Sequence, residues 1–154
     1  KDSFRKQTQQ FLGLILSQDS LLSTRKEFSV SSWLSAARSL GTTEEEKKLY
    51  EWNASALIPV WGDSIAANQG GLHDYSHREW SGLLKDLYYQ RWNTFFEQKQ
   101  QELDGKLDKS TAEPIHFYGM EKAWAEKSKT VDVSGKNGPS VIETAKTVYR
   151  SAVE

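Results

Sequence analysis

The chain has 154 residues, and its 20 lysines and arginines against 21 aspartates and glutamates give a net charge of −1. This length is enough for one domain with its own core, but the charge balance offers no large field of one sign to recruit nucleic acid or an anionic membrane. The sequence has no cysteine, which excludes disulfides, thiolate metal sites and a cysteine nucleophile. No apolar run approaches the roughly 18 residues of a membrane span, so we expect neither a nucleic-acid partner nor a membrane span.

The first part of the sequence predicts two amphipathic helices. Residues 2–17 carry apolar side chains at helical spacing, with glutamine and lysine at the remaining positions. We expect Asp19 or Ser20 to cap a second helix, because short polar side chains accept hydrogen bonds from the first turn. Gly41 is placed to end that helix as a left-handed residue.

A third helix is predicted from about residue 44 to residue 58. Thr43 and Glu46 fit a capping box at its start. We expect Pro59 to kink or end the helix, because proline lacks an N–H and clashes with the preceding turn. Its apolar side chains form one stripe, which consists of Leu49, Trp52, Ala56 and Leu57.

After a loop at residues 62–74, we expect one long helix near residues 75–103, started by caps at Asp74 or at Ser76 with Glu79. Gly105 ends this helix, a fifth helix covers 116–127, and a last one starts at Pro139 or Ser140. We therefore predict an all-α fold, a bundle of about five or six helices that forms a single domain over residues 1–154.

Two sets of polar residues near residue 75 suggest chemistry, but each has a simpler explanation. His73 and His77 have the spacing of a zinc site, yet His73 precedes the predicted helix cap and no third ligand is evident. Asp74 and Glu79 could form a catalytic carboxylate pair, but helix capping explains both residue types. We therefore predict no metal site, no cofactor and no catalytic residue in this chain.

Aromatic residues gather in one stretch, because four of the six tryptophans and four of the six tyrosines lie between residues 49 and 92. Within it, Trp61, Leu72 and Tyr75 flank the predicted loop and do not sit in the middle of a helix. Such side chains can wall a sugar pocket, since the apolar face of a pyranose stacks on an aromatic ring. They can equally pack the loop onto the bundle, which is the commoner role of aromatic residues.

Several motifs, in the same order, resemble the C-terminal helical domain of the α-N-acetylglucosaminidase family. The strongest are Trp61-Gly62, Leu72-His-Asp-Tyr75, residues 80–83 and residues 88–92. Weaker matches lie at residues 22–28, 33–38 and 41–50 and at Asn53, so that the resemblance covers most of residues 10–100. In the family's pattern, the tryptophan of Trp-Gly, the apolar residue before Asp-Tyr and the tyrosine of Asp-Tyr correspond to Trp61, Leu72 and Tyr75.

The resemblance implies a function. Family members are retaining glycoside hydrolases that remove terminal α-linked N-acetylglucosamine, and both catalytic glutamates lie in a central (β/α)8 barrel. Their C-terminal domain packs on that barrel and lends the three corresponding residues to the wall of the sugar pocket. We therefore expect this chain to be a C-terminal fragment of a larger glycoside hydrolase, with the barrel and a terminal α-linked N-acetylglucosamine as its partners, and to be inactive alone.

An alternative reading remains open from the sequence, namely a free-standing helical module that binds a protein or a glycan and has no catalytic role. The sequence itself does not give the compartment. The resemblance implies a secreted or periplasmic protein if the source is bacterial and a lysosomal one if it is animal.

Overall fold

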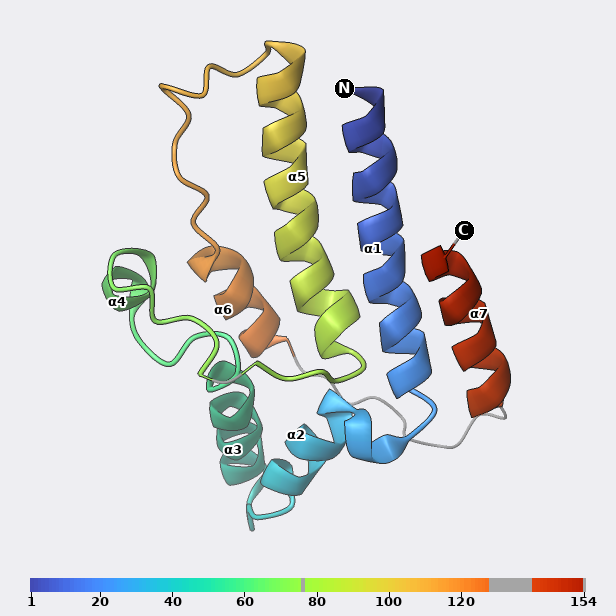
Figure 1. Cartoon of the computed structure of the whole chain (residues 1–154). Coiled ribbons are helices and arrows are strands. Elements are labelled where there is room, and N and C mark those ends of the chain that lie inside the picture. Colours follow the sequence, from blue (N-terminus) through green and yellow to red (C-terminus); the bar gives the residue numbers. More distant parts are fainter. Residues whose placement is uncertain (76, 128–139, 154) are drawn as a thin grey trace.

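The computed structural model describes residues 1–75, 77–127 and 140–153. In these ranges every regular element is a helix, and the only β pairing consists of isolated bridges, which confirms the all-α prediction (Figure 1). The elements in chain order are α1 (Asp2–Leu22), the 3₁₀ turn η1 (Lys26–Phe28), α2 (Val30–Arg38), α3 (Glu44–Ala56), α4 (Ser64–Asn68), the π-helical turn η2 (Leu84–Tyr88), α5 (Tyr89–Asp104), α6 (Tyr118–Glu126) and α7 (Val141–Val153).

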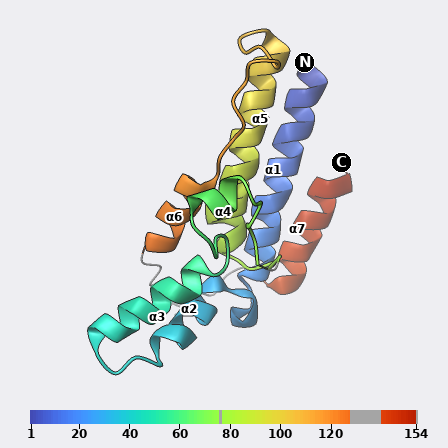
Figure 2. The same cartoon turned by 90° about the vertical axis from the view of Figure 1, so that its left-hand side faces the viewer.

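Helices α1 and α5 lie side by side and antiparallel, and α7 packs on the side of α1 away from α5 (Figures 1 and 2). Helices α2 and α3 pack against each other at the lower end of this pair in Figure 1, and α6 contacts both α3 and η2. None of the helices in the described ranges is long and apolar enough to cross a bilayer.

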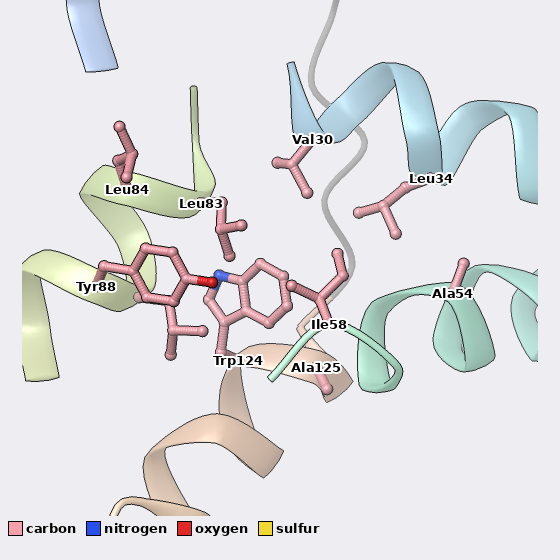
Figure 3. Close-up of a cluster of buried hydrophobic side chains, with 10 residues drawn as sticks. Val30, Leu34, Ala54, Ile58, Leu83, Leu84, Tyr88, Trp124 and Ala125 are labelled. Carbon is pink, nitrogen blue, oxygen red and sulfur yellow. The ribbon is translucent and has the colours of Figure 1, made fainter. Parts of the chain in front are cut away.

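The core forms where α2, the end of α3, η2 and α6 meet. In Figure 3 the indole of Trp124 lies among Val30, Ile58 and Leu83, and Ile58 and Leu83 are almost completely buried. The cluster comprises Val30, Leu34, Ala54, Ile58, Leu83, Leu84, Leu87, Tyr88, Trp124 and Ala125. Burying an aliphatic side chain stabilises a fold by about 1.5–3 kcal/mol. The core therefore holds both ends of the irregular segment between α3 and η2 in place.

The first helix is longer than predicted, and its extension changes the role of Asp19. Asp19 lies inside α1 and does not cap the next helix, so that prediction was wrong. Its Oδ1 atom accepts the backbone N–H of Gly82 at 2.6 Å and that of Lys85 at 3.1 Å. Asp19 therefore caps the start of the η2–α5 helix from a distant part of the chain. Burial raises the pKa of Asp19, although the two N–H donors act in the opposite direction.

The predicted second helix is divided, because the chain leaves α1 after Leu22, passes through the 3₁₀ turn η1 and enters an α-helix again only at Val30. The Ser29 hydroxyl caps α2 by accepting the N–H of Ser31 at 3.3 Å. Gly41 does not have a positive φ, so the prediction of a left-handed residue there was wrong. The structure needs glycine for another reason, since a Cβ at this position would lie 2.5 Å from the backbone nitrogen of Lys47.

The predicted capping box of α3 is confirmed. The Thr43 hydroxyl accepts the N–H of Glu46 at 3.1 Å, and the Glu46 carboxylate accepts the N–H of Thr43 at 3.2 Å. The helix ends at Ala56, three residues before Pro59, close to the predicted boundary.

The apolar stripe of α3 lies on the outside of the bundle. Leu49 and Trp52 are both exposed, whereas Glu51 and Ser55, on the other side of the helix, are buried. Glu51 pairs with Arg38 of α2 at 3.2 Å. The helix thus turns Glu51, Ala54 and Ser55 toward its neighbours and leaves Leu49 and Trp52 uncovered in this chain.

The long helix begins about eight residues later than predicted, at Leu83, and its first turns are π-helical. Asp74 therefore does not cap it, and that prediction was wrong, whereas the alternative capping box includes Ser76, which lies outside the described residues. Gly105 ends α5 with φ 73°, as predicted.

The last two helices agree with the sequence, and α4 is an addition within the predicted loop. Helix α6 falls inside the predicted range of 116–127, and the Ser140 hydroxyl accepts the N–H of Glu143 at 3.2 Å at the start of α7. Pro139, the other predicted start, lies outside the described residues.

Candidate functional site

Trp61 and Tyr75, two of the three predicted pocket residues, lie side by side. Val60 and His73 form an antiparallel bridge, and the Asp74 N–H donates to the carbonyl of Pro59 at 2.9 Å, so the two ends of the loop run alongside each other. This pairing places the rings of Trp61 and Tyr75 edge to face, with centroids 5.5 Å apart and planes at 88°. The side chains remain 47% and 60% exposed, so they are not sealed in the core.

Leu72, the third predicted residue, lies close to Gly62, the residue that follows Trp61. A Cβ on Gly62 would lie 3.6 Å from Leu72 Cδ1 and only 2.9 Å from the Cβ of Ala66. Gly62 is therefore required by a close approach of the two sides of the loop. The Leu72 N–H donates to the carbonyl of Ala66 at 3.2 Å, which ties the residue to α4. The structure thus brings the three predicted residues together around the Trp61-Gly62 turn.

Helix α4 folds the tip of this loop back on itself. Asp63 caps the helix, since its Oδ1 atom accepts the N–H of Ala66 at 2.8 Å. Ala67 is almost fully buried, and α4 contacts α6. The loop is therefore supported at its tip as well as at its ends.

The two residues before Tyr75, His73 and Asp74, belong to a cluster of four polar side chains that was not predicted from the sequence. Arg91 donates to both oxygens of Asp74, from Nη1 to Oδ2 at 2.7 Å and from Nη2 to Oδ1 at 3.1 Å. Glu121 is completely buried and lies between Arg91 and His73. Its Oε1 is 2.5 Å from Arg91 Nη2, an ion-pair contact, and its Oε2 is 2.9 Å from His73 Nδ1.

The electrostatics of this cluster favour a structural role, in which it fixes the loop, over a role in proton transfer. Burial raises the pKa of Glu121, while Arg91 and His73 oppose the shift. Asp74 and Glu121 share one guanidinium, so both carboxylates are already paired. The Tyr88 hydroxyl points at Asp74 Oδ1 at 3.4 Å, and burial together with the Asp74 charge raises the pKa of Tyr88 to about 12. Tyr88 is therefore a neutral donor under ordinary conditions.

The two histidines have different partners. His77 lies 2.7 Å from Glu79 through Nε2, and its ring stacks on Tyr88 with centroids 5.7 Å apart. His73 instead contacts Glu121. Over residues 1–75, 77–127 and 140–153, no group of three or more potential ligands is arranged to hold a metal ion.

A cavity of about 720 Å³ opens next to the cluster, between α1, α5 and α6. Its polar end is formed by His73, Asp74, Arg91 and Glu121. Its apolar wall includes Phe11, Leu14, Ile15, Trp92, Phe95 and Phe117. These side chains come from helices far apart in the sequence, so no local sequence pattern predicts the cavity.

A signal for the missed cluster does exist in the sequence. Glu121 is four residues after Phe117 and three before Trp124, so it shares their face of the helix. A carboxylate on an apolar face must find a partner when it is buried. Arg91, which follows Leu87 by four residues on the apolar face of its own helix, is the complementary charge.

Comparison with known proteins places the chain in a family. The family model described as the α-N-acetylglucosaminidase (NAGLU) C-terminal domain matches residues 1–151. The chain belongs to this family. Human α-N-acetylglucosaminidase is 31% identical over 84 residues, which are 54% of this chain and 11% of the human protein.

Solved structures of family members share the fold. The family 89 glycoside hydrolase from Clostridium perfringens, in complex with 2-acetamido-1,2-dideoxynojirmycin, is similar with a TM-score of 0.83 and 37% identity. That match covers 98% of this chain and 17% of the other. The clostridial enzyme in complex with its substrate GlcNAc-α-1,4-galactose gives a TM-score of 0.77 and 38% identity over 93% of this chain and 16% of that one. The chain thus spans less than a fifth of the length of these relatives.

Proposed function

We propose that this chain acts as the C-terminal accessory domain of an exo-α-N-acetylglucosaminidase, and that it packs on a (β/α)8 catalytic barrel. In this proposal Trp61, Leu72 and Tyr75 line the pocket that receives the terminal sugar. The observation that carries it is the exposed, edge-to-face pair of Trp61 and Tyr75 on a loop fixed at both ends and at its tip. The family match over residues 1–151 favours this reading over a free-standing binding module.

The geometry of the pair suits an N-acetylated sugar. Two rings whose planes meet at 88° form a corner with two apolar walls. The C–H face of a pyranose can stack on one wall, while its N-acetyl methyl group contacts the other. The Tyr75 hydroxyl adds a polar tip that can hydrogen-bond to a sugar hydroxyl.

The outer face of α3 supports the proposed packing on a barrel. Leu49 and Trp52 are exposed on it, and α3, α4 and the aromatic loop all lie on the side of the bundle away from α7 (Figures 1 and 2). Exposed apolar side chains on one side of a domain are typical of an interface when they form a patch. The proposed partner is the catalytic domain, which supplies the two carboxylates that hydrolysis requires. The 154-residue chain alone is therefore expected to release no N-acetylglucosamine from an aryl α-glycoside.

The test uses the full-length family enzyme that carries this domain. Trp61→Ala and Tyr75→Ala should each lower kcat/KM on an aryl α-N-acetylglucosaminide by about tenfold or more, the equivalent of about 1.4 kcal/mol. Both residues are about half exposed and lie outside the core cluster, so the melting temperature should change little. Tyr149→Ala is the matched control, since that tyrosine is similarly exposed but lies on α7. Unchanged kinetics in both loop variants would refute the pocket role.

A further inference from the structure

We infer that Arg91 and Glu121 are positioning residues, which act through Asp74 and His73 to set the orientation of the aromatic pair. This inference rests on the proposed function, because its consequence is read in sugar turnover. It concerns Arg91 on α5 and Glu121 on α6, which contact the loop residues His73 and Asp74.

The loop carries two kinds of side chain in one short run. His73 and Asp74 turn inward and bind residues of α5 and α6, whereas Tyr75, the next residue, is exposed. The direction of Tyr75 therefore depends on how the two residues before it are anchored.

The backbone at Asp74 needs that anchoring. Its φ is 53°, and no other non-glycine residue in the described ranges has a positive φ. Such a conformation is disfavoured for residues with a Cβ and persists where the surroundings over-determine it. Two hydrogen bonds from the planar Arg91 guanidinium to the Asp74 carboxylate supply this constraint.

Arg91 is itself held by a second carboxylate. Glu121, completely buried on α6, contacts Arg91 Nη2 through one oxygen and His73 Nδ1 through the other. The four side chains thus close a ring that joins α5, α6 and the loop at two successive residues. Because of this closure, a shift of the guanidinium moves the backbone immediately before Tyr75.

The effect reaches Trp61 as well. The Asp74 N–H is bonded to the carbonyl of Pro59, and His73 bridges to Val60, the residue before Trp61. Both rings therefore depend on the same anchor, and an altered anchor changes the corner that they form. A displacement of about 1 Å at a binding residue can cost 10²-fold in rate.

The structure offers a matched ion pair for comparison. Arg38 also bridges two carboxylates, with Nη2 2.6 Å from Glu44 and Nη1 3.2 Å from the buried Glu51. That cluster joins α2 to α3, and the partners of its arginine, Glu44 and Glu51, lie outside the loop that carries Trp61 and Tyr75. Lysine at either position keeps the charge but loses the planar fork of donors.

The experiment compares Arg91→Lys with Arg38→Lys in the full-length family enzyme, at a temperature where circular dichroism shows both to be folded. We expect Arg91→Lys to lower kcat/KM on an aryl α-N-acetylglucosaminide by about ten- to a hundredfold. Arg38→Lys should stay within about twofold of wild type. Glu121→Gln keeps the shape of the buried side chain, and it should also lower kcat/KM.

A double-mutant cycle separates positioning from general destabilisation. If Arg91 acts through the rings, Arg91→Lys should have almost no further effect on a Trp61→Ala, Tyr75→Ala background. The inference would be overturned if Arg91→Lys lowered kcat/KM as much in the Trp61→Ala, Tyr75→Ala variant as in wild type. It would also be overturned if Arg91→Lys and Arg38→Lys lowered kcat/KM equally. If the ring variants themselves have wild-type kinetics, it is the proposed function that fails.

Discussion

The contact between Asp19 and the start of the η2–α5 helix yields a sharp prediction. Asp19→Ala removes the acceptor of two backbone N–H groups, those of Gly82 and Lys85. Loss of a helix cap costs about 0.5–2 kcal/mol, and a hydrogen bond to a charged group contributes about 1.5–3 kcal/mol. We therefore expect Asp19→Ala to lower the free energy of unfolding by about 2–4 kcal/mol.

Asp19→Asn should behave quite differently. Both N–H groups donate to the same atom, Oδ1, and an asparagine side chain retains one carbonyl oxygen that can accept both. The substitution also removes the cost of burying a charge. We expect Asp19→Asn to stay within about 1 kcal/mol of wild type at neutral pH.

The pH dependence follows from the direction of the shift. Burial raises the pKa of Asp19, so the folded state favours the protonated carboxyl more than the unfolded chain does. The resulting stabilisation is fully present below the ordinary aspartate pKa of about 3.9 and is lost as pH rises through the raised value. Wild type should therefore lose stability relative to Asp19→Asn between pH about 3 and pH about 7.

Urea unfolding followed by circular dichroism, at both pH values, measures these differences. The control is Asp63→Ala, which removes the side chain that caps α4 by accepting the N–H of Ala66. That control should cost no more than about 0.5–2 kcal/mol. The proposed role of Asp19 is wrong if Asp19→Asn lowers the free energy of unfolding as much as Asp19→Ala does. It is also wrong if the stability of wild type relative to Asp19→Asn increases as pH rises.

Two more predictions concern the close approach at Gly41 and the buried hydroxyl of Tyr88. Gly41→Ala should destabilise by about 1–3 kcal/mol in thermal unfolding, because its Cβ would lie 2.5 Å from the Lys47 nitrogen. Gly13→Ala, with open space around the added Cβ, should instead stabilise α1 by about 0.5–1 kcal/mol, and equal effects at both sites would contradict the packing. Since the pKa of Tyr88 is raised to about 12, stability should fall as pH rises from about 10 through that value. An ultraviolet titration should show one late tyrosine that is lost in Tyr88→Phe, whereas six tyrosines titrating together near pH 10 would exclude the shift.

The features that the sequence predicted correctly are local ones. The Thr43–Glu46 capping box joins residues three apart, and Gly105 adopts a left-handed conformation next to the helix it ends. In both places the relevant hydrogen bonds lie within a few residues. Propensity and spacing are therefore sufficient to read them.

The errors arose where an aspartate bonded to a distant element. Asp19 and Asp74 both precede an apolar helical pattern, so each resembles a local cap. In the fold, Asp19 reaches Gly82, 63 residues away, and Asp74 reaches Arg91, 17 residues away. No local pattern distinguishes these long-range acceptors from ordinary caps.

The candidate site was predicted in composition but not in arrangement. The sequence singled out Trp61, Leu72 and Tyr75, yet it left open whether they pack inward or face outward. Their exposure depends on the pairing of Val60 with His73 and on the burial of Glu121 behind them. Both are tertiary features that residue types alone do not determine.

The most direct test of the proposed pocket is a crystal structure of the full-length family enzyme that carries this domain, with N-acetylglucosamine bound. We predict that the sugar lies against the catalytic barrel, with its ring or its acetyl methyl group in van der Waals contact, at about 4 Å, with Trp61 and Tyr75. A bound sugar that touches neither ring would contradict the central claim.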